Sequence, residues 1–255
     1  MPKFRIRSTS TEPSNIEASD WSGAITKLMG RMTGSGSTVN VTLGEGGATE
    51  VWEDGREERF IIDTDDGIPS AFELSDVPTT DLWDAPIPGS GARDARKPDD
   101  NEVALISKSV SALREMPSDT DACEQALNLL LTHIPAESGS VLLAEGSHLR
   151  FTSVRGPHAD ALIGKTIPID QGIAGAVATS GRSLLVQEAR TNPHHNATVD
   201  QKINHITRTI LAVPIQTQEL TLGVLELLNP FGSDTFLPWH KALSRDVAAA
   251  LAARF

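Results

Sequence analysis

The chain has 255 residues, which is enough for one large domain or two modest ones, and its formal net charge is −12. This acidic balance argues against nucleic acid and anionic membrane surfaces as partners, because both are themselves negatively charged. No apolar run approaches the roughly 18 residues of a membrane helix, and the N-terminus lacks the apolar core of a signal peptide. We therefore expect a cytoplasmic protein.

The first 63 residues contain several short strand patterns and one helical pattern. Apolar and basic side chains alternate over 4–7, as in a half-buried strand, and Asp20 is placed to cap the helix that follows. The predicted elements are a strand over 4–7, a polar turn over 8–15, a helix over 21–32 and strands over 39–43, 49–53 and 59–63. We predict a small β-α-β-β-β module over residues 1–63.

Residues 64–99 differ in composition from the rest of the chain. They hold seven aspartates and five prolines among few apolar residues. Low hydrophobicity with negative charge and proline is typical of disorder, so we predict an acidic linker. A second interpretation stays open, in which Asp81, Leu82 and Trp83 form a tethered recognition segment that docks on this or another protein.

Helical and strand patterns return over residues 100–255. The predicted helices cover 103–116, 119–134, 159–163, 173–179 and 238–255, and the predicted strands cover 141–144, 149–155, 165–169, 183–187, 209–215 and 220–228. Gly181 stands where a helix usually needs a left-handed C-cap. We predict an α+β domain with a six-stranded, largely antiparallel sheet and the terminal helices packed on one face.

Four pieces of this domain follow one another in a distinctive order. They are IPIDQGIAGAVATSGRSLLVQEA at 167–189, RTILAVPI at 208–215, LGVLELLNP at 222–230 and Phe236. Together they resemble the GAF domain, a small-molecule sensing module of phosphodiesterases, cyclases, sensor kinases and many bacterial regulators. The resemblance covers about residues 100–255 and does not extend to the N-terminal module.

The resemblance implies a ligand pocket on the sheet face opposite the terminal helices, and pairing of two chains through those helices. The ligand contacts expected from it are Gly172, Ile173, Ala174, Asn192, His195, Thr207, Arg208 and Thr209. The dimer contacts expected from it are Val103, Ile106, Val110, Leu243, Val247 and Leu251. The alternative for the first group is that they are ordinary loop residues.

The sequence offers little for catalysis or metal binding. Cys123 is the only cysteine, which excludes an intramolecular disulfide and a cysteine-rich metal site, and its apolar surroundings predict a core position. His194, His195 and His205 lie in a polar segment without metal-ligand spacing, so we predict no metal. A nucleophile elbow and a P-loop are both missing. We predict no catalytic residues, and the sequence identifies no cofactor.

Cyclic-nucleotide-binding GAF domains carry an Asn-Lys…Phe…Asp-Glu signature, which this chain matches only in part. Asn229 and Phe236 fit it, but Pro230 replaces the lysine, and His240 and Lys241 replace the acidic pair. We expect a cytoplasmic bacterial signalling protein that binds a small molecule or a protein and forms a homodimer. The alternatives are a scaffold without a ligand and, less favoured, a cyclic-nucleotide sensor. The N-terminal module or the acidic linker is expected to hold any protein partner.

Overall fold

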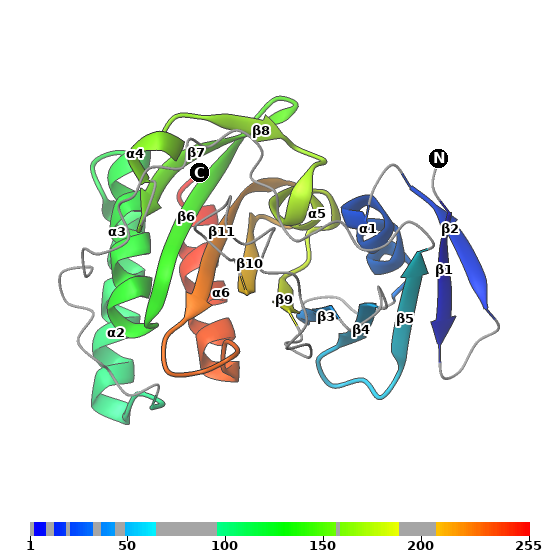
Figure 1. Ribbon diagram of the computed structural model, residues 1–255. Coiled ribbons are helices and arrows are strands. Elements are labelled where there is room, and N and C mark those ends of the chain that lie inside the picture. Colours follow the sequence, from blue (N-terminus) through cyan, green and yellow to red (C-terminus); the bar gives the residue numbers. More distant parts are fainter. Residues whose placement is uncertain are drawn as a thin grey trace.

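The structure is a computed structural model whose main feature is one long, twisted sheet (Figure 1). The residues described are 3–8, 13–18, 21–32, 37–43, 49–64, 96–156, 159–188 and 208–255. The predicted acidic linker lies outside them from 65 to 95, and so does most of the polar segment that follows β9. Within the described residues, no helix is long and apolar enough to cross a membrane.

The N-terminal part consists of five strands and one helix. They are β1 (Lys3–Ser8), β2 (Ser14–Glu17), α1 (Trp21–Arg31), β3 (Val39–Leu43), β4 (Thr49–Glu53) and β5 (Arg59–Thr64). On α1, Ala24, Ile25 and Leu28 are buried, and so is Met32 just beyond the end of the helix. The predicted turn over 8–15 is wrong at its end, because β2 begins at Ser14 and pairs with β1. β2 has four residues and buries only Ile16, which is too short a pattern to predict a strand.

The C-terminal part supplies the remaining strands and helices. They are α2 (Asp100–Ala112), the short helix η2 (Leu113–Glu115), α3 (Asp119–His133), β6 (Ala136–Glu145), β7 (His148–Arg155), α4 (Ala159–Leu162), β8 (Thr166–Pro168), α5 (Gly172–Ser180), β9 (Leu184–Glu188), β10 (Thr209–Gln216), β11 (Thr221–Pro230) and α6 (Pro238–Ala252). Gly181 ends α5 in the left-handed conformation, with φ of 63°, as its position predicts.

The sheet is continuous across both parts of the chain. Its described strands number eleven, in the order β2-β1-β5-β4-β3-β9-β10-β11-β6-β7-β8. The join is β3 beside β9, a parallel pair in which Val39 lies opposite Leu184 and Val41 opposite Val186. The other described pairs are antiparallel. The six-stranded sheet that the sequence predicts is therefore extended by the N-terminal strands.

The two faces of the sheet carry separate apolar cores. On one face, α2, α3 and α6 cover the strands, and Leu127, Leu211 and Val247 belong to this core. On the other face, α1 and α5 lie over the strands, and Ile25 and Val177 share a core with Val186. We call these the α6 face and the α5 face.

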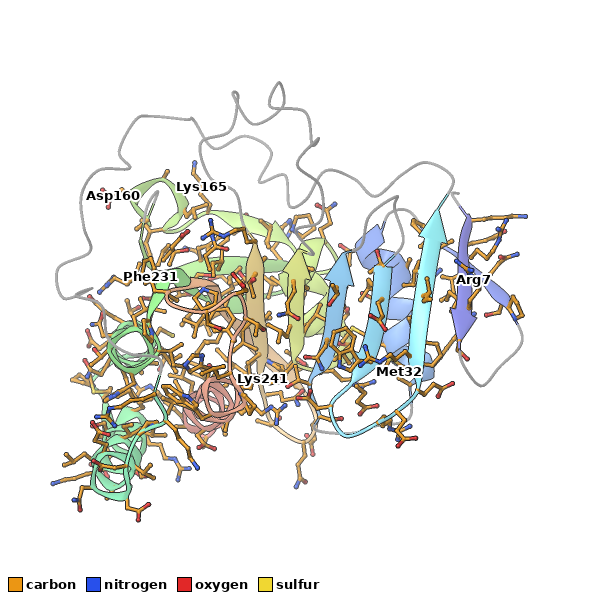
Figure 2. The ribbon with its side chains drawn as sticks, turned by 60° about the horizontal axis from the view of Figure 1, so that its bottom comes forward. Arg7, Met32, Asp160, Lys165, Phe231 and Lys241 are labelled. Atoms are coloured by element: carbon orange, nitrogen blue, oxygen red, sulfur yellow. The ribbon has the colours of Figure 1, made fainter. Side chains whose placement is uncertain are left out.

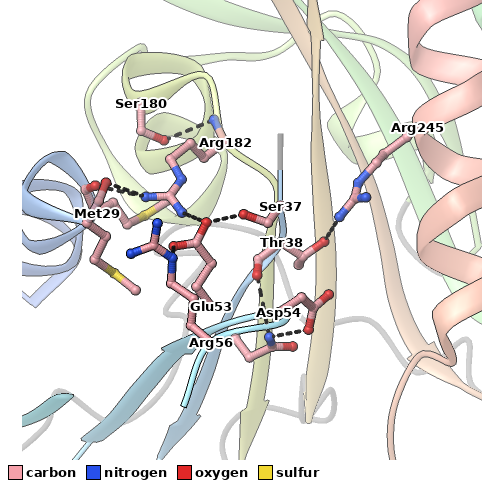
Figure 3. Close-up of polar contacts among 11 residues, drawn as sticks. Met29, Ser37, Thr38, Glu53, Asp54, Arg56, Ser180, Arg182 and Arg245 are labelled. Carbon is pink, nitrogen blue, oxygen red and sulfur yellow. Dashed lines mark hydrogen bonds and ion pairs between the residues drawn. The ribbon is translucent and has the colours of Figure 1, made fainter. Parts of the chain in front are cut away.

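The end of β4 is held from both faces of the sheet, and Figure 3 shows the contacts of Glu53 on one of them. Successive side chains of a strand point to opposite faces. Glu53 points to the α5 face, and the side chain of Asp54 therefore points to the α6 face. Arg182, between α5 and β9, forms an ion pair with Glu53, with 2.9 Å between Nη2 and Oε1. On the other face Lys241 of α6, which is labelled in Figure 2, donates from Nζ to Asp54 Oδ2 at 2.7 Å.

Arg182 also closes the end of α1. Its Nη1 donates to the carbonyl oxygens of Met29 and Met32, at 3.0 and 3.2 Å, at the C-terminal end of the helix. Arg182 is 8% exposed and Glu53 is 2% exposed, so the ion pair is removed from solvent. Arg56 and Ser37 contact the same carboxylate. Residues of α1, β4 and the α5–β9 junction are thus fixed by one guanidinium group.

Replacing Arg182 by methionine is expected to lower the free energy of unfolding by about 3 kcal/mol, since a buried carboxylate loses its main counter-ion. Urea unfolding followed by circular dichroism measures this loss. The matched control is Arg59→Met, which removes an exposed ion pair with Glu50 and is expected to cost about 1 kcal/mol or less. Equal losses in the two variants would show that burial of the Arg182–Glu53 pair has no special weight.

Candidate functional site

The predicted ligand contacts in α5 lie at the start of a mostly buried helix. Gly172 is exposed and has a left-handed φ of 67°. Ile173 and Ala174 are buried in the core of the α5 face, so their side chains support the helix. The predicted contacts Asn192, His195 and Thr207 lie outside the described residues, as do His194 and His205.

Arg208 and Thr209 belong to a polar cluster at the ends of three strands. Asn229 Oδ1 accepts from the backbone N–H groups of Arg208 and Thr209, at 2.7 and 3.1 Å. Glu137 joins the cluster, because its carboxylate accepts from Arg208 Nη2 at 3.0 Å and from Asn229 Nδ2 at 2.7 Å. The Thr209 hydroxyl donates to the carbonyl of Asp234 at 2.9 Å.

This cluster sets the beginning of β10. Asn229 has a φ of 52°, in the left-handed region that asparagine tolerates better than most residues. That conformation accompanies the side-chain bonds to the N–H groups of Arg208, just before β10, and of Thr209, its first residue. Arg208 and Thr209 therefore already have hydrogen-bond partners within the protein. Their bonding thus gives no support to their predicted role as ligand contacts.

The predicted dimer residues fall into two groups. Val247 and Leu251 are 0% exposed, and Leu243 is also buried, because this side of α6 packs on the sheet. They lie within the apolar core of a single chain. On α2, Ile106 and Val110 pack against the same core, whereas Val103 is 44% exposed. Leu105, which the sequence analysis did not single out, is 67% exposed.

His240 and Lys241 occupy the positions at which the cyclic-nucleotide signature has acidic residues. His240 is buried against Phe236 and Trp239, and its Nδ1 accepts from the Leu237 N–H at 3.1 Å. Burial lowers the pKa of His240 to about 4, so the ring is neutral near pH 7. Lys241 is paired with Asp54 of the N-terminal part. Both residues thus have structural roles in this chain.

The α5 face of the sheet holds one carboxyl group that the sequence analysis missed. On β11, Val224, Glu226 and Leu228 point to this face, and Val224 and Leu228 belong to its core. Glu226 is half-buried. It lies opposite Ala212 of β10 and Ser140 of β6 in the sheet register. The sequence pattern that could have identified Glu226 is a single charged residue in the apolar strand 221–230, at a position that alternation places on the same face as buried neighbours.

Glu226 has a perturbed ionisation state. The Ser140 hydroxyl donates to its Oε2 at 3.3 Å, and this is its one hydrogen bond within the described residues. Burial raises the pKa of Glu226 to about 7, although the Ser140 bond acts in the opposite direction. A carboxyl group with this pKa on an interior face, short of partners, is typical of a binding or catalytic position.

Other features of the described structure do not form a competing site. A hollow of about 540 Å³ lies at the turn between β10 and β11 and the end of α6, on the α6 side of the sheet. Its lining residues are Gln216, Thr217, Gln218, Ala249, Ala252 and Ala253. Within the described ranges, no three His, Cys, Asp or Glu side chains are grouped to hold a metal ion. Cys123 is buried as predicted, and burial raises the pKa of its thiol to about 12.

Comparison with known proteins identifies the C-terminal part. The family model for the GAF domain matches residues 120–255. A probable 3',5'-cyclic phosphodiesterase, pde-5, of Caenorhabditis elegans is 38% identical over 61 residues, which are 24% of this chain and 8% of that protein. The alpha' subunit of the cone cGMP-specific 3',5'-cyclic phosphodiesterase of Mus musculus is 33% identical over 69 residues, or 27% of this chain and 8% of that protein. The chain thus matches a small part of these relatives.

Among solved structures, the GAF domain of a phosphoenolpyruvate-protein phosphotransferase from Coxiella burnetii resembles this chain with a TM-score of 0.50. The two are 17% identical, and the alignment covers 64% of this chain and 94% of the other. At this identity the similarity concerns the fold. It agrees with the sheet and helices observed over the C-terminal part.

Replacing Glu226 by glutamine is expected to change how stability depends on pH. The ordinary pKa of 4.5 applies to the unfolded chain, and the folded value is about 7, so the folded state keeps its proton longer. The wild type therefore loses stability as pH rises from 4.5 to 7, and the variant lacks this loss. Urea unfolding should show the variant gaining about 2 kcal/mol relative to wild type over this range. A pH-independent difference would contradict the assignment.

Proposed function

Because the chain belongs to the GAF domain family, we propose that it is a regulatory protein that binds a small molecule on the α5 face of its sheet. The observation that carries this proposal is Glu226, a half-buried carboxyl group with a single described hydrogen bond. A group of this kind costs stability unless it has partners. A ligand that provides partners for this carboxyl group offsets that cost, which is a reason for the group to be present.

We also propose that the chain pairs with another copy of itself, and that the contact between the two copies lies on α2. Helix α2 has thirteen residues, and Ile106 is the one that is buried among them. Val103 and Leu105 expose apolar side chains on the same helix. Residues two positions apart point to nearly opposite sides of a helix, so a second α2 would cover Leu105, the more exposed of the two. The α6 residues Leu243, Val247 and Leu251 are buried within one chain. In such a dimer they would not contact the other copy and would only hold α6 in place.

A cyclic nucleotide is a second candidate ligand, and the names of the two phosphodiesterase relatives favour it. Two features of this chain weigh against it. The signature lysine is replaced by Pro230, and Lys241 is committed to Asp54. A carboxylate at Glu226 would also repel the cyclic phosphate if the phosphate lay near it. A scaffold without a ligand is the remaining alternative.

We propose binding rather than catalysis, and a cytoplasmic location. The single cysteine is buried with a raised pKa, which is the opposite of a reactive thiol. A free thiol without a disulfide partner is also what proteins of a reducing compartment usually contain.

Native mass spectrometry of the purified full chain tests the proposed function. The expected result is a dimer that carries an additional small mass, which is released on denaturation, and the same mass should be absent from Glu226→Gln. A dimer without additional mass, and without thermal stabilisation by metabolite mixtures, would favour the scaffold.

Replacing Leu105 by glutamate is expected to weaken the dimer at least tenfold, because a charge would enter an apolar contact between two α2 helices. Sedimentation velocity over a concentration series measures the dissociation constant. The matched control is Leu220→Glu, since Leu220 is 63% exposed on the β10–β11 turn. If both variants dimerise as the wild type does, α2 is not the contact.

A further inference from the structure

Small side chains flank Glu226 on the α5 face. In the sheet register, the row that crosses Glu226 runs through Leu184, Ala212, Ser140 and Val154. The two immediate neighbours of Glu226 are therefore an alanine and a serine. Neither side chain reaches far above the sheet, so the carboxyl group has no bulky neighbour within its own row.

The hydrogen-bonding capacity of Glu226 is mostly unused. An ionised carboxylate accepts about four hydrogen bonds through its two oxygens. Ser140 supplies one, to Oε2, and the described residues give Oε1 none. In the ionised form the remaining capacity consists of acceptors, which a group that donates hydrogen bonds would fill.

Two arginines that stand just before the neighbouring strands β9 and β10 are already paired. Arg182, which lies on the α5 face, forms its ion pair with Glu53. Arg208, at the start of β10, is paired with Glu137 at 3.0 Å. Glu226 takes part in no ion pair among the described residues. The described residues therefore supply no positive charge to this carboxylate.

We propose that the ligand of the α5 face presents a positively charged nitrogen group with two or more N–H donors, such as an amine or an amidine, to Glu226. This inference rests on the proposed function and names the ligand class of the same site. An amidine places two parallel N–H donors against the two carboxylate oxygens. An amine places one charge and up to three donors there.

The side chains around Glu226 indicate the chemical character of the rest of the ligand. Val224 and Leu228 precede and follow it on the same face of β11, and Val154 lies beyond Ser140. The group attached to the cation therefore meets apolar side chains. Burial raises the pKa of Glu226 to about 7, and a cation bound beside it would favour the ionised form. A negatively charged ligand group at the same place would be repelled.

The test uses two sets of probes, each with one carbon skeleton and three charge states. One set is benzamidine, benzamide and benzoate, and the other is butylamine, butyramide and butyrate. Saturation-transfer NMR and calorimetric titration with the full chain measure their binding. The cationic member of at least one set is expected to bind tenfold more tightly than its neutral and anionic counterparts, and Glu226→Gln is expected to remove that preference.

Two further variants make the result specific. Glu219→Gln makes the same chemical change at an exposed carboxylate of the β10–β11 turn and is expected to leave binding unchanged. Glu226→Asp keeps the charge on a shorter side chain and is expected to retain a preference for cations, which provides a readout if the glutamine variant folds poorly. Equal binding of all three charge states, no binding of either cation, or a preference that survives Glu226→Gln would each overturn the ligand class.

The outcome is separable from that of the proposed function. If native mass spectrometry finds a neutral or anionic molecule whose binding survives Glu226→Gln, the chain binds a small molecule and the ligand class is wrong. If no mass accompanies the protein and no probe binds, both proposals fail. A bound cation that is lost with Glu226→Gln supports both.

Discussion

The parallel pairing of β3 with β9 is the constraint on which the rest of the arrangement depends. Without it, β9 would be an edge strand with unpaired backbone groups. The pairing brings the end of β4 between two elements of the GAF domain, and adjacent side chains fix it there. Glu53 binds Arg182 on the α5 face and Asp54 binds Lys241 on the α6 face. A strand places neighbouring residues on opposite faces, so two consecutive acidic residues connect the α5–β9 junction with the C-terminal helix.

The two buried or partly buried carboxylates of the α5 face differ in how their charge is compensated. Glu53 has Arg182, Arg56 and Ser37 around it, and this set of contacts stabilises the joint between the two parts of the chain. Glu226 has only the Ser140 hydroxyl among the described residues, and burial raises its pKa to about 7. This difference in compensation separates a structural carboxylate from one suited to a ligand.

Much of the fold could be predicted from the sequence, because it rests on local patterns. The apolar face of α1 and the glycine that ends α5 follow from helical spacing and backbone conformation. The β3–β9 join could not be predicted, since it pairs segments more than a hundred residues apart whose patterns only indicate strands. The buried side of α6 could not be assigned either, because an apolar helical stripe looks the same whether it covers a sheet or a partner. Glu226 was missed because it lies inside a motif that was matched as a whole.

The measurement that tests the account most directly is a carbon-detected NMR titration of the Glu226 carboxyl group, assigned by comparison with Glu226→Gln. It reports the state of the one group on which the ligand proposal depends, with or without a ligand in hand. We predict a midpoint of about 7 in the free protein and a lower midpoint when benzamidine is bound. A midpoint near 4.5, the ordinary value, would mean that Glu226 is well solvated or already paired, and it would contradict the assignment of this face as the binding site.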